Sequence, residues 1–187
     1  MIITGKYPYL RLRRSRKFHW SRRLVQENNL SVNDFILPIF LFEGKNKKIP
    51  IKSMPNVYRY SIDMLATIVD KAIRRKIPMV ALFPYTNPKL KNNLGTEALN
   101  ENNLVCQGIR YVKKRYKNTI GIMCDVALDP YTSHAHDGIL KNNYIINDET
   151  VDLLVEQSIL QARMGCDVIA PSDMMDGRIK KIRQRLD

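Results

Sequence analysis

The chain has 187 residues, of which 44% are hydrophobic, so that it can bury a sizeable core and is expected to be globular. It has no run of about 18 apolar residues and no apolar N-terminal segment, which argues against a membrane span or a secretory signal and favours a cytoplasmic location. The net charge of +13 suggests nucleic-acid binding, but residues 1–23 and 178–187 account for 12 of these charges. The body between them is nearly neutral, which argues against a basic face that covers the whole fold.

Residues 1–20 show no clean helix or strand period, and they carry a basic run from Arg11 to Lys17. Aromatic residues surround this run: Tyr7, Tyr9, Phe18 and Trp20. Such an arm could clamp RNA, could resemble an organelle transit peptide, or could pack on a neighbouring subunit. The aromatic area favours the last interpretation, so we predict that residues 1–30 form an oligomerisation arm.

From residue 31 onward, apolar segments of strand length alternate with segments of helical period. The predicted strands are residues 35–42, 79–83, 119–124 and 167–170. The predicted helices are a short one at 21–29, one capped by Ser61, one at 98–116, one from Asn147 to Gly165, and a basic one after Gly177. Pro38 is a defect in the first strand, because it cannot donate to a sheet ladder.

Alternation of strands and helices predicts an α/β fold with a parallel sheet and crossover helices. Four βα units are half of an eight-fold (β/α)8 barrel, which takes about 250 residues. We therefore predict that residues 31–187 are the first half of such a barrel. A four-stranded flavodoxin-like layer is the alternative, and it needs no missing half.

The three cysteines, Cys106, Cys124 and Cys166, lie far apart and form no C-x-x-C motif. This spacing argues against a disulfide scaffold or a thiolate metal site. Each falls within a predicted helix or strand, so we predict buried, reduced thiols.

The most polar stretch, residues 125–138, directly follows the predicted strand 119–124 and holds three carboxylates and two imidazoles. The ends of parallel strands meet at one edge, and in barrels of this kind the carboxyl-terminal edge carries the chemistry. Asp125 and Asp129 follow the third predicted strand, and Ser172 and Asp173 follow the fourth. Carboxylates in this position could bind a divalent cation, orient an amine, or act as acid and base.

Several motifs, in chain order, resemble the N-terminal half of the porphobilinogen synthases, a family also called 5-aminolevulinate dehydratases. The motifs are Arg11-x-Arg-Arg, Asp34-x-Ile-x-Pro-x-Phe, Glu43-Gly44, Ser53-Met-Pro, the stretch 125–138, Asn147-Asp148 and the segment 170–178, whose sequence is Ala-Pro-Ser-Asp-Met-Met-Asp-Gly-Arg. The last motif is highly specific, and the resemblance covers almost the whole chain.

The resemblance implies a TIM barrel with an N-terminal arm that embraces a partner subunit, commonly in a homo-octamer. It implies a lyase that condenses two molecules of 5-aminolevulinate to porphobilinogen with loss of two waters, an early step of haem and other tetrapyrrole biosynthesis. It also implies that Asp125 is a polar partner for a substrate amine or for proton transfer, and that Ser172 lies near the pocket of the first Schiff-base lysine.

Zinc-dependent members of the family carry cysteines where this chain has Ala127, Asp129 and Asp137. Two hard carboxylates favour Mg²⁺ or a similar ion at Asp129 and Asp137, or no metal in the active site. Asn56 and Ala135 stand where the family pattern has glycine, which suggests slightly altered turns.

The resemblance also places both Schiff-base lysines beyond residue 187, so we expect this chain alone to be inactive. The alternative from another class is a basic nucleic-acid-binding module that uses the N-terminal arm. The neutral body and the specific motifs oppose this alternative, and we expect neither a nucleic acid nor a membrane as a partner.

Overall fold

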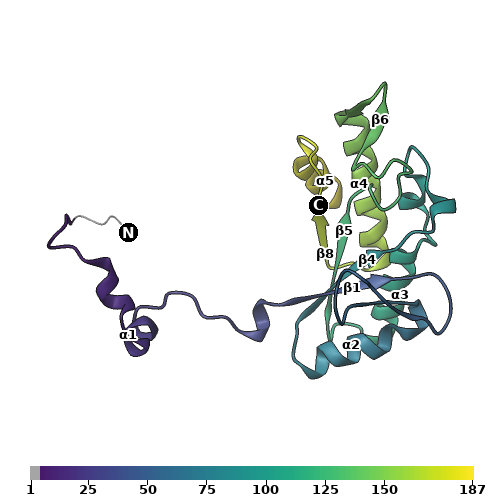
Figure 1. Ribbon diagram of the computed structural model, residues 1–187. Coiled ribbons are helices and arrows are strands. Elements are labelled where there is room, and N and C mark those ends of the chain that lie inside the picture. Colours follow the sequence, from purple (N-terminus) through teal and green to yellow (C-terminus); the bar gives the residue numbers. More distant parts are fainter. Residues whose placement is uncertain (1–4) are drawn as a thin grey trace. The chain divides into compact units, whose positions relative to one another are not determined.

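The computed structural model describes residues 5–187, and the chain divides into two compact units, Met1–Asp34 and Phe35–Asp187 (Figure 1). The boundary lies four residues after the one predicted from the sequence. None of the helices in residues 5–187 is both long and apolar enough to cross a bilayer.

The first unit contains little regular structure. Its helices are the 3-10 turns Leu12–Arg16 and Val32–Asp34 and the helix α1 (His19–Leu24). Ser21 is its buried residue, and the Oγ of Ser21 donates to the carbonyl of Phe18 at 2.9 Å. Helix α1 starts two residues earlier than predicted and ends five residues earlier, at Leu24. Asn28 and Asn29, which the prediction included, are poor helix formers.

A mostly parallel sheet organises the second unit. Its strands are β1 (Ile36–Leu41), β2 (Lys48–Pro50), β3 (Tyr58–Tyr60), β4 (Met79–Pro84), β5 (Gly121–Val126) and β8 (Val168–Pro171). The four long strands β1, β4, β5 and β8 lie side by side and are parallel. The short strand β3 pairs in parallel with the end of β1, and β2 pairs antiparallel with β3.

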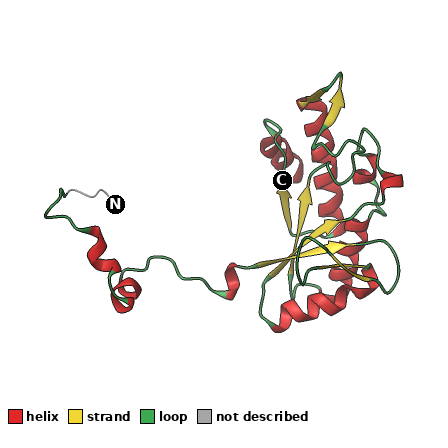
Figure 2. Cartoon of the chain, viewed as in Figure 1, coloured by secondary structure: helices red, strands yellow, loops and turns green. Residues whose placement is uncertain are grey.

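The order of the four predicted strands distinguishes the two architectures. They lie in chain order, β1-β4-β5-β8, whereas a flavodoxin-like sheet reverses its strand order at a switch point. The helices that follow them are α2 (Leu65–Arg74), α3 (Leu104–Tyr116), α4 (Asn147–Met164) and α5 (Arg178–Leu186) (Figure 2). Each of these helices contacts the next, as the outer helices of a barrel do.

Two predicted helix starts differ from the structure. Residues Thr96–Leu99 form a separate 3-10 turn, and α3 begins only after Asn103, whose side chain accepts the backbone N–H of Cys106. Ser61 does not cap a helix with its side chain. Its Oγ accepts the N–H of Lys47 at 2.9 Å, and the 3-10 turn Ile62–Met64 precedes α2.

Both ends of α4 agree with the prediction. Asp148 and Glu149 stand in its first turn, where carboxylates interact favourably with the helix dipole. Gly165 ends the helix with φ at 105°, a conformation that costs glycine little.

A hairpin between β5 and α4 was not predicted. Its strands are β6 (Ile139–Lys141) and β7 (Tyr144–Ile146), which pair antiparallel. Asn142 and Asn143 connect them, and both have positive φ, at 51° and 61°. Positive φ at both central residues is the requirement of a type I′ turn, and asparagine tolerates this better than most residues.

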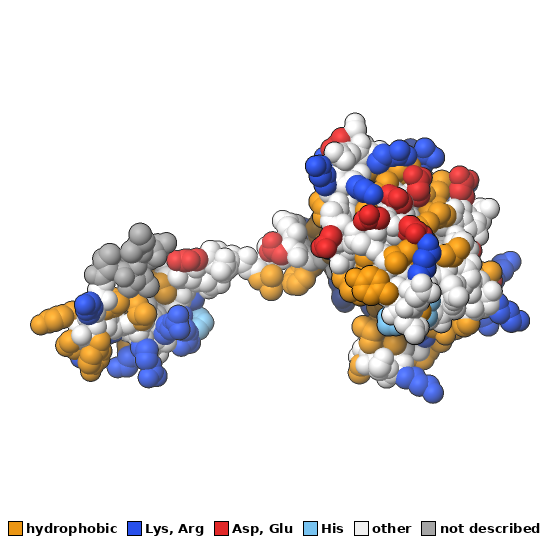
Figure 3. Space-filling view, turned by 90° about the horizontal axis from the view of Figure 1, so that it is seen from above, with side chains coloured by type: hydrophobic (Ala, Val, Ile, Leu, Met, Phe, Trp, Pro, Cys, Tyr) orange, Lys and Arg blue, Asp and Glu red, His pale blue; other side chains and the backbone are white. Residues whose placement is uncertain are grey.

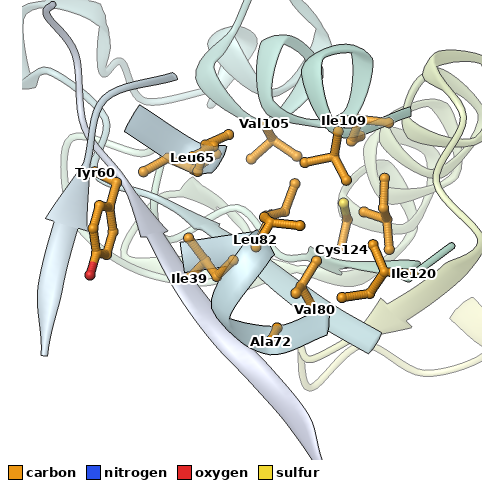
Figure 4. Packing of buried hydrophobic residues seen from close by; sticks show 14 residues of the cluster. Ile39, Tyr60, Leu65, Ala72, Val80, Leu82, Val105, Ile109, Ile120 and Cys124 are labelled. Atoms are coloured by element: carbon orange, nitrogen blue, oxygen red, sulfur yellow. The ribbon is translucent and has the colours of Figure 1, made fainter. Parts of the chain in front are cut away.

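The larger core cluster lies between the sheet and helices α2 and α3, where Leu65, Leu82 and Ile109 are fully buried (Figure 4). Gly108 lets α3 approach the sheet closely. A Cβ at this position would lie 3.0 Å from Cδ1 of Leu41. A second cluster packs α4 and α5 against the ends of β5 and β8, and it includes Leu154 and Ile182.

Cys106 and Cys124 are buried free thiols, as predicted. The prediction was wrong for Cys166, which lies between α4 and β8 and is partly exposed. Helix α4 already ends at Met164 and β8 begins only at Val168, so Cys166 stands in the connection between them.

Candidate active site at the carboxyl ends of the strands

The two residues predicted to be catalytic lie together. Asp125 is the second-last residue of β5, and Ser172 directly follows β8, the next strand of the sheet. The backbone N–H of Ser172 donates to the carbonyl of Val126 at 3.2 Å. The Ser172 side chain also lies close enough to the carboxylate of Asp125 to favour its ionised form and lower its pKa. Parallel pairing of β5 and β8 thus brings residues 47 positions apart into contact.

The environment of Asp125 favours its protonated form. Burial is the largest cause that raises the pKa of this carboxyl above its ordinary value, and the nearby Ser172 side chain opposes the rise. The carboxylates of Asp129, Asp137 and Asp173 raise the pKa further, because like charges disfavour ionisation. A carboxyl with a raised pKa at the end of a barrel strand is a candidate for proton transfer.

The predicted metal ligands, Asp129 and Asp137, share this environment. Burial is the main cause that raises the pKa of each, and Asp129 also raises the pKa of Asp137. One oxygen of Asp137 accepts the N–H of Leu128 at 3.1 Å, while Lys91 partly offsets the rise at Asp129. Carboxylates are the oxygen ligands that Mg²⁺ prefers, and Mg²⁺ often keeps several waters beside one or two of them.

The described part of the chain, residues 5–187, contains no group of three or more His, Cys, Asp or Glu side chains placed to hold a metal ion. The structure therefore brings Asp129 and Asp137 into one electrostatic environment without forming a complete ligand set. Figure 3, which views the chain from above relative to Figure 1, shows acidic side chains gathered on this face of the second unit.

Asp173, which the sequence placed at the same edge, is engaged by its own loop. Its Oδ2 lies 2.8 Å from Nε of Arg178, and its Oδ1 accepts the N–H of Met175 at 2.7 Å. Arg178 also donates to the carbonyl of Met175 at 2.6 Å. This carboxylate therefore fixes the loop that carries Ser172.

Asn147, the first residue of α4, has a positioning role that the sequence analysis did not identify. Its Oδ1 accepts the N–H of Asp176 at 2.7 Å, and its Nδ2 donates to the carbonyl of the same residue at 3.2 Å. This two-way pair ties the loop after β8 to the start of α4. The signal in the sequence was an asparagine at a helix start, which is indistinguishable from an ordinary cap.

The two histidines of the polar stretch lie at its exposed part. The N–H of His136 donates to Nδ1 of His134 at 3.2 Å, and Nε2 of His134 lies 3.3 Å from the carbonyl of Asn93. Ala135 between them has φ at 57°, and Asn56 has φ at 65°. Both positions where glycine was expected thus keep a left-handed backbone that glycine would adopt without strain.

Comparison with known proteins supports the fold and the family. The model of the family "Delta-aminolevulinic acid dehydratase" matches residues 9–187. A protein of that name from Bradyrhizobium diazoefficiens is 53% identical over 178 residues, which are 95% of this chain and 50% of that protein. The chloroplastic delta-aminolevulinic acid dehydratase 1 of Arabidopsis thaliana is 45% identical over 95% of this chain and 41% of its own.

A crystal structure of the delta-aminolevulinic acid dehydratase (porphobilinogen synthase) of Toxoplasma gondii ME49, in complex with the reaction product porphobilinogen, has a similar fold. Its TM-score is 0.87 at 39% identity, and the match covers 95% of this chain and 51% of that one. The match confirms a TIM-barrel architecture for the four βα units. The chain spans about half the length of these relatives, and it belongs to the delta-aminolevulinic acid dehydratase family.

Proposed function

We propose that this chain is the N-terminal half of a porphobilinogen synthase, a lyase that condenses two molecules of 5-aminolevulinate to porphobilinogen with loss of two waters. The observation that carries the proposal is the pair of Asp125 and Ser172 at the carboxyl ends of adjacent parallel strands. The family match supports the reaction, and the raised pKa of Asp125 supports a role in proton transfer.

In this proposal Ser172 orients the Asp125 carboxyl, which exchanges a proton with the substrate amine or with a leaving water. The family resemblance assigns the covalent steps to two lysines that form Schiff bases with the substrates, and it places both lysines beyond residue 187. The chain therefore supplies part of the acid–base machinery and none of the nucleophiles, so the chain alone should not form porphobilinogen.

Among residues 5–187, the unpaired edge of the sheet at β8 supports the proposal that the chain forms only part of a barrel. Beside β8, a groove of about 300 Å³ is lined mainly by apolar residues of β8 and α5: Val168, Ile169, Pro171, Ile179, Ile182 and Leu186. All four residues of β8 are only partly buried. A fifth barrel strand paired with β8 would cover this groove.

Complementation tests the function. The chain is mixed with the C-terminal half of the Bradyrhizobium relative, and porphobilinogen formation is measured. The mixture should be active and each half inactive. Asp125→Asn or Ser172→Ala should abolish most of the activity, whereas Asp152→Asn, at an exposed aspartate paired with Lys181, should leave it unchanged. Porphobilinogen formation by the 187-residue chain alone would refute the proposed incompleteness.

The metal assignment is the second element of the proposal. Asp129 and Asp137 would hold a Mg²⁺ ion together with water molecules, and the ion would supply positive charge to a bound substrate oxygen. Mg²⁺ should then raise the melting temperature of the chain, because a ligand that binds only the folded state stabilises it. Asp129→Asn and Asp137→Asn should remove this effect and Asp152→Asn should retain it. An equal effect of Mg²⁺ on all four proteins would contradict the assignment.

The N-terminal arm, residues 1–30, is proposed to pack on a partner subunit in a homo-octamer of the complete enzyme. Its large side chains support a contact role, since Tyr9 is 93% exposed and Trp20 is 65% exposed. Removal of residues 1–30 should lower the sedimentation coefficient of the complemented enzyme. Only the basic charge at the two ends of the chain favours the nucleic-acid-binding alternative. A cytoplasmic location belongs to the same proposal and is testable by cell fractionation.

A further inference from the structure

The carboxyl end of β5 lies between two strands that end in proline. Strand β4 ends at Pro84, and β8 ends at Pro171, which is the register partner of Val126. Proline has no backbone N–H, so β4 cannot donate a ladder hydrogen bond at Pro84. On the other side, β8 still reaches the end of β5, because the N–H of Ser172 donates to the carbonyl of Val126 at 3.2 Å. The carbonyls of Asp125 and Ala127, which alternate with that of Val126 along the chain, therefore need donors from elsewhere.

Two glutamines of α4 supply these donors. Nε2 of Gln161 donates to the carbonyl of Asp125 at 2.9 Å, and Nε2 of Gln157 donates to the carbonyl of Ala127 at 3.3 Å. The glutamines are four residues apart and so lie on one face of the helix, while the carbonyls are two residues apart along the strand direction. Four helical residues rise about 6 Å and two strand residues about 6.6 Å, so the two spacings match.

Both glutamines are almost completely buried, with 1% of Gln157 and 2% of Gln161 exposed. Their Oε1 atoms are buried as well, and neither accepts a hydrogen bond from another residue in the described part of the chain. A buried acceptor without a donor costs stability, and apolar residues are the usual occupants of a helix face that packs on a sheet. The two side chains are thus poor choices for packing alone.

We propose that Gln157 and Gln161 are positioning residues of the candidate active site. Gln161 fixes the backbone of Asp125 so that its carboxyl meets Ser172, and Gln157 fixes the start of the turn that leads to Asp129. The inference goes beyond the proposed reaction, because it concerns the geometry of these carboxyls and holds for any substrate.

The test is a carboxyl ¹³C NMR titration of Asp125 in the 187-residue chain and its Gln161→Met variant. Methionine keeps the length and approximate volume of glutamine but cannot donate. The carbonyl of Asp125 must then bind water, and this hydration reduces the burial that is the main cause of the raised pKa. We expect the pKa of Asp125 to shift down toward the ordinary value of an aspartate.

The matched control is Ser158→Ala. Ser158 is also buried on α4, but its Oγ donates only to the carbonyl of Leu154 in the same helix, at 2.7 Å. This variant should lose some stability without a change in the pKa of Asp125. A folded Gln161→Met variant with an unchanged or higher Asp125 pKa would overturn the proposal and leave a purely structural role.

If Gln161→Met does not fold, Gln157→Met takes its place, because it removes only the longer of the two bonds. The titration of Asp125 is then followed in this variant, because the released carbonyl of Ala127 lies two residues after Asp125. A lower pKa of Asp125 supports the proposal, and an unchanged one overturns it.

Discussion

Substitution of Asp167 should show how the sheet is held at the end opposite the candidate site. One carboxylate oxygen of Asp167 accepts the N–H of Ile122 at 2.8 Å, and the backbone N–H of Asp167 donates to the carbonyl of Ile122 at 2.9 Å. Lys113 of α3 contacts both carboxylate oxygens, at 2.6 and 2.8 Å. The residue thus joins the start of β8 to β5 and to a helix.

The two interactions differ in their expected contribution. Ile122 is fully buried, so Asp167→Ala leaves its N–H without an acceptor, which costs about 1–3 kcal/mol. The ion pair is worth less, about 0.5–1 kcal/mol, because the side chains of Lys113 and Asp167 are 22% and 40% exposed and solvent screens them. Asp167→Ala should therefore lower the free energy of unfolding by about 2–3 kcal/mol.

Urea unfolding followed by circular dichroism measures these differences, and equal m-values would show that the variants unfold in the same way. Asp167→Asn keeps an oxygen acceptor, and Lys113→Met removes only the cation, so each should cost about 1 kcal/mol or less. High salt should reduce the effect of Lys113→Met and leave most of that of Asp167→Ala. If Asp167→Ala costs no more than Lys113→Met, the buried N–H is not the main contributor and the reasoning is wrong.

Three further outcomes follow from the same structure. Gly108→Ala should destabilise the chain by about 1 kcal/mol in urea unfolding, although alanine favours helices, because its Cβ would meet Leu41 and Leu82 at 3.0 and 3.3 Å; an exposed control, Lys114→Ala, should change little. Ala135→Gly should stabilise it by about 0.5–1 kcal/mol by relieving a φ of 57°, and a loss of stability would contradict this. Burial raises the pKa of Asp129 in the folded chain. The folded chain therefore loses stability as the pH rises through this pKa and Asp129 ionises. Without divalent ions, Asp129→Asn should thus be more stable than the parent chain near pH 7, and this gain should disappear toward pH 3.

The strands and the site edge were predictable because their signals are local or follow from parallel pairing. Apolar runs identified β1, β4, β5 and β8 to within two residues at every end, and residues that follow adjacent parallel strands must lie at one edge. The contact between Asp125 and Ser172 follows from this rule. The raised pKa of Asp125, which burial causes and Ser172 opposes, depends on the packed structure and could not be predicted from the residues.

The hairpin and the glutamine donors were not predictable in the same way. Strands β6 and β7 have three residues each, too few to show a period, although the Asn142-Asn143 pair is a turn signal. Gln157 and Gln161 look like polar interruptions of a helix face. Their role depends on Pro84 at the end of β4, which is distant in sequence and becomes a neighbour of β5 only through the pairing of the two strands.

The carboxylates at the candidate site have an arrangement that folding alone would not favour. Asp125, Asp129 and Asp137 each have a raised pKa, and burial is the main cause in each case, so their ionised forms oppose folding at neutral pH. Lys91 offsets this only at Asp129. Cations that enter the site, whether a metal ion or the amines of substrates and lysines, would lower these pKa values and recover that free energy. The stability lost in the half-chain is thus available as binding energy when the site is completed, which is why we expect Mg²⁺ and the complementing half to stabilise the same residues.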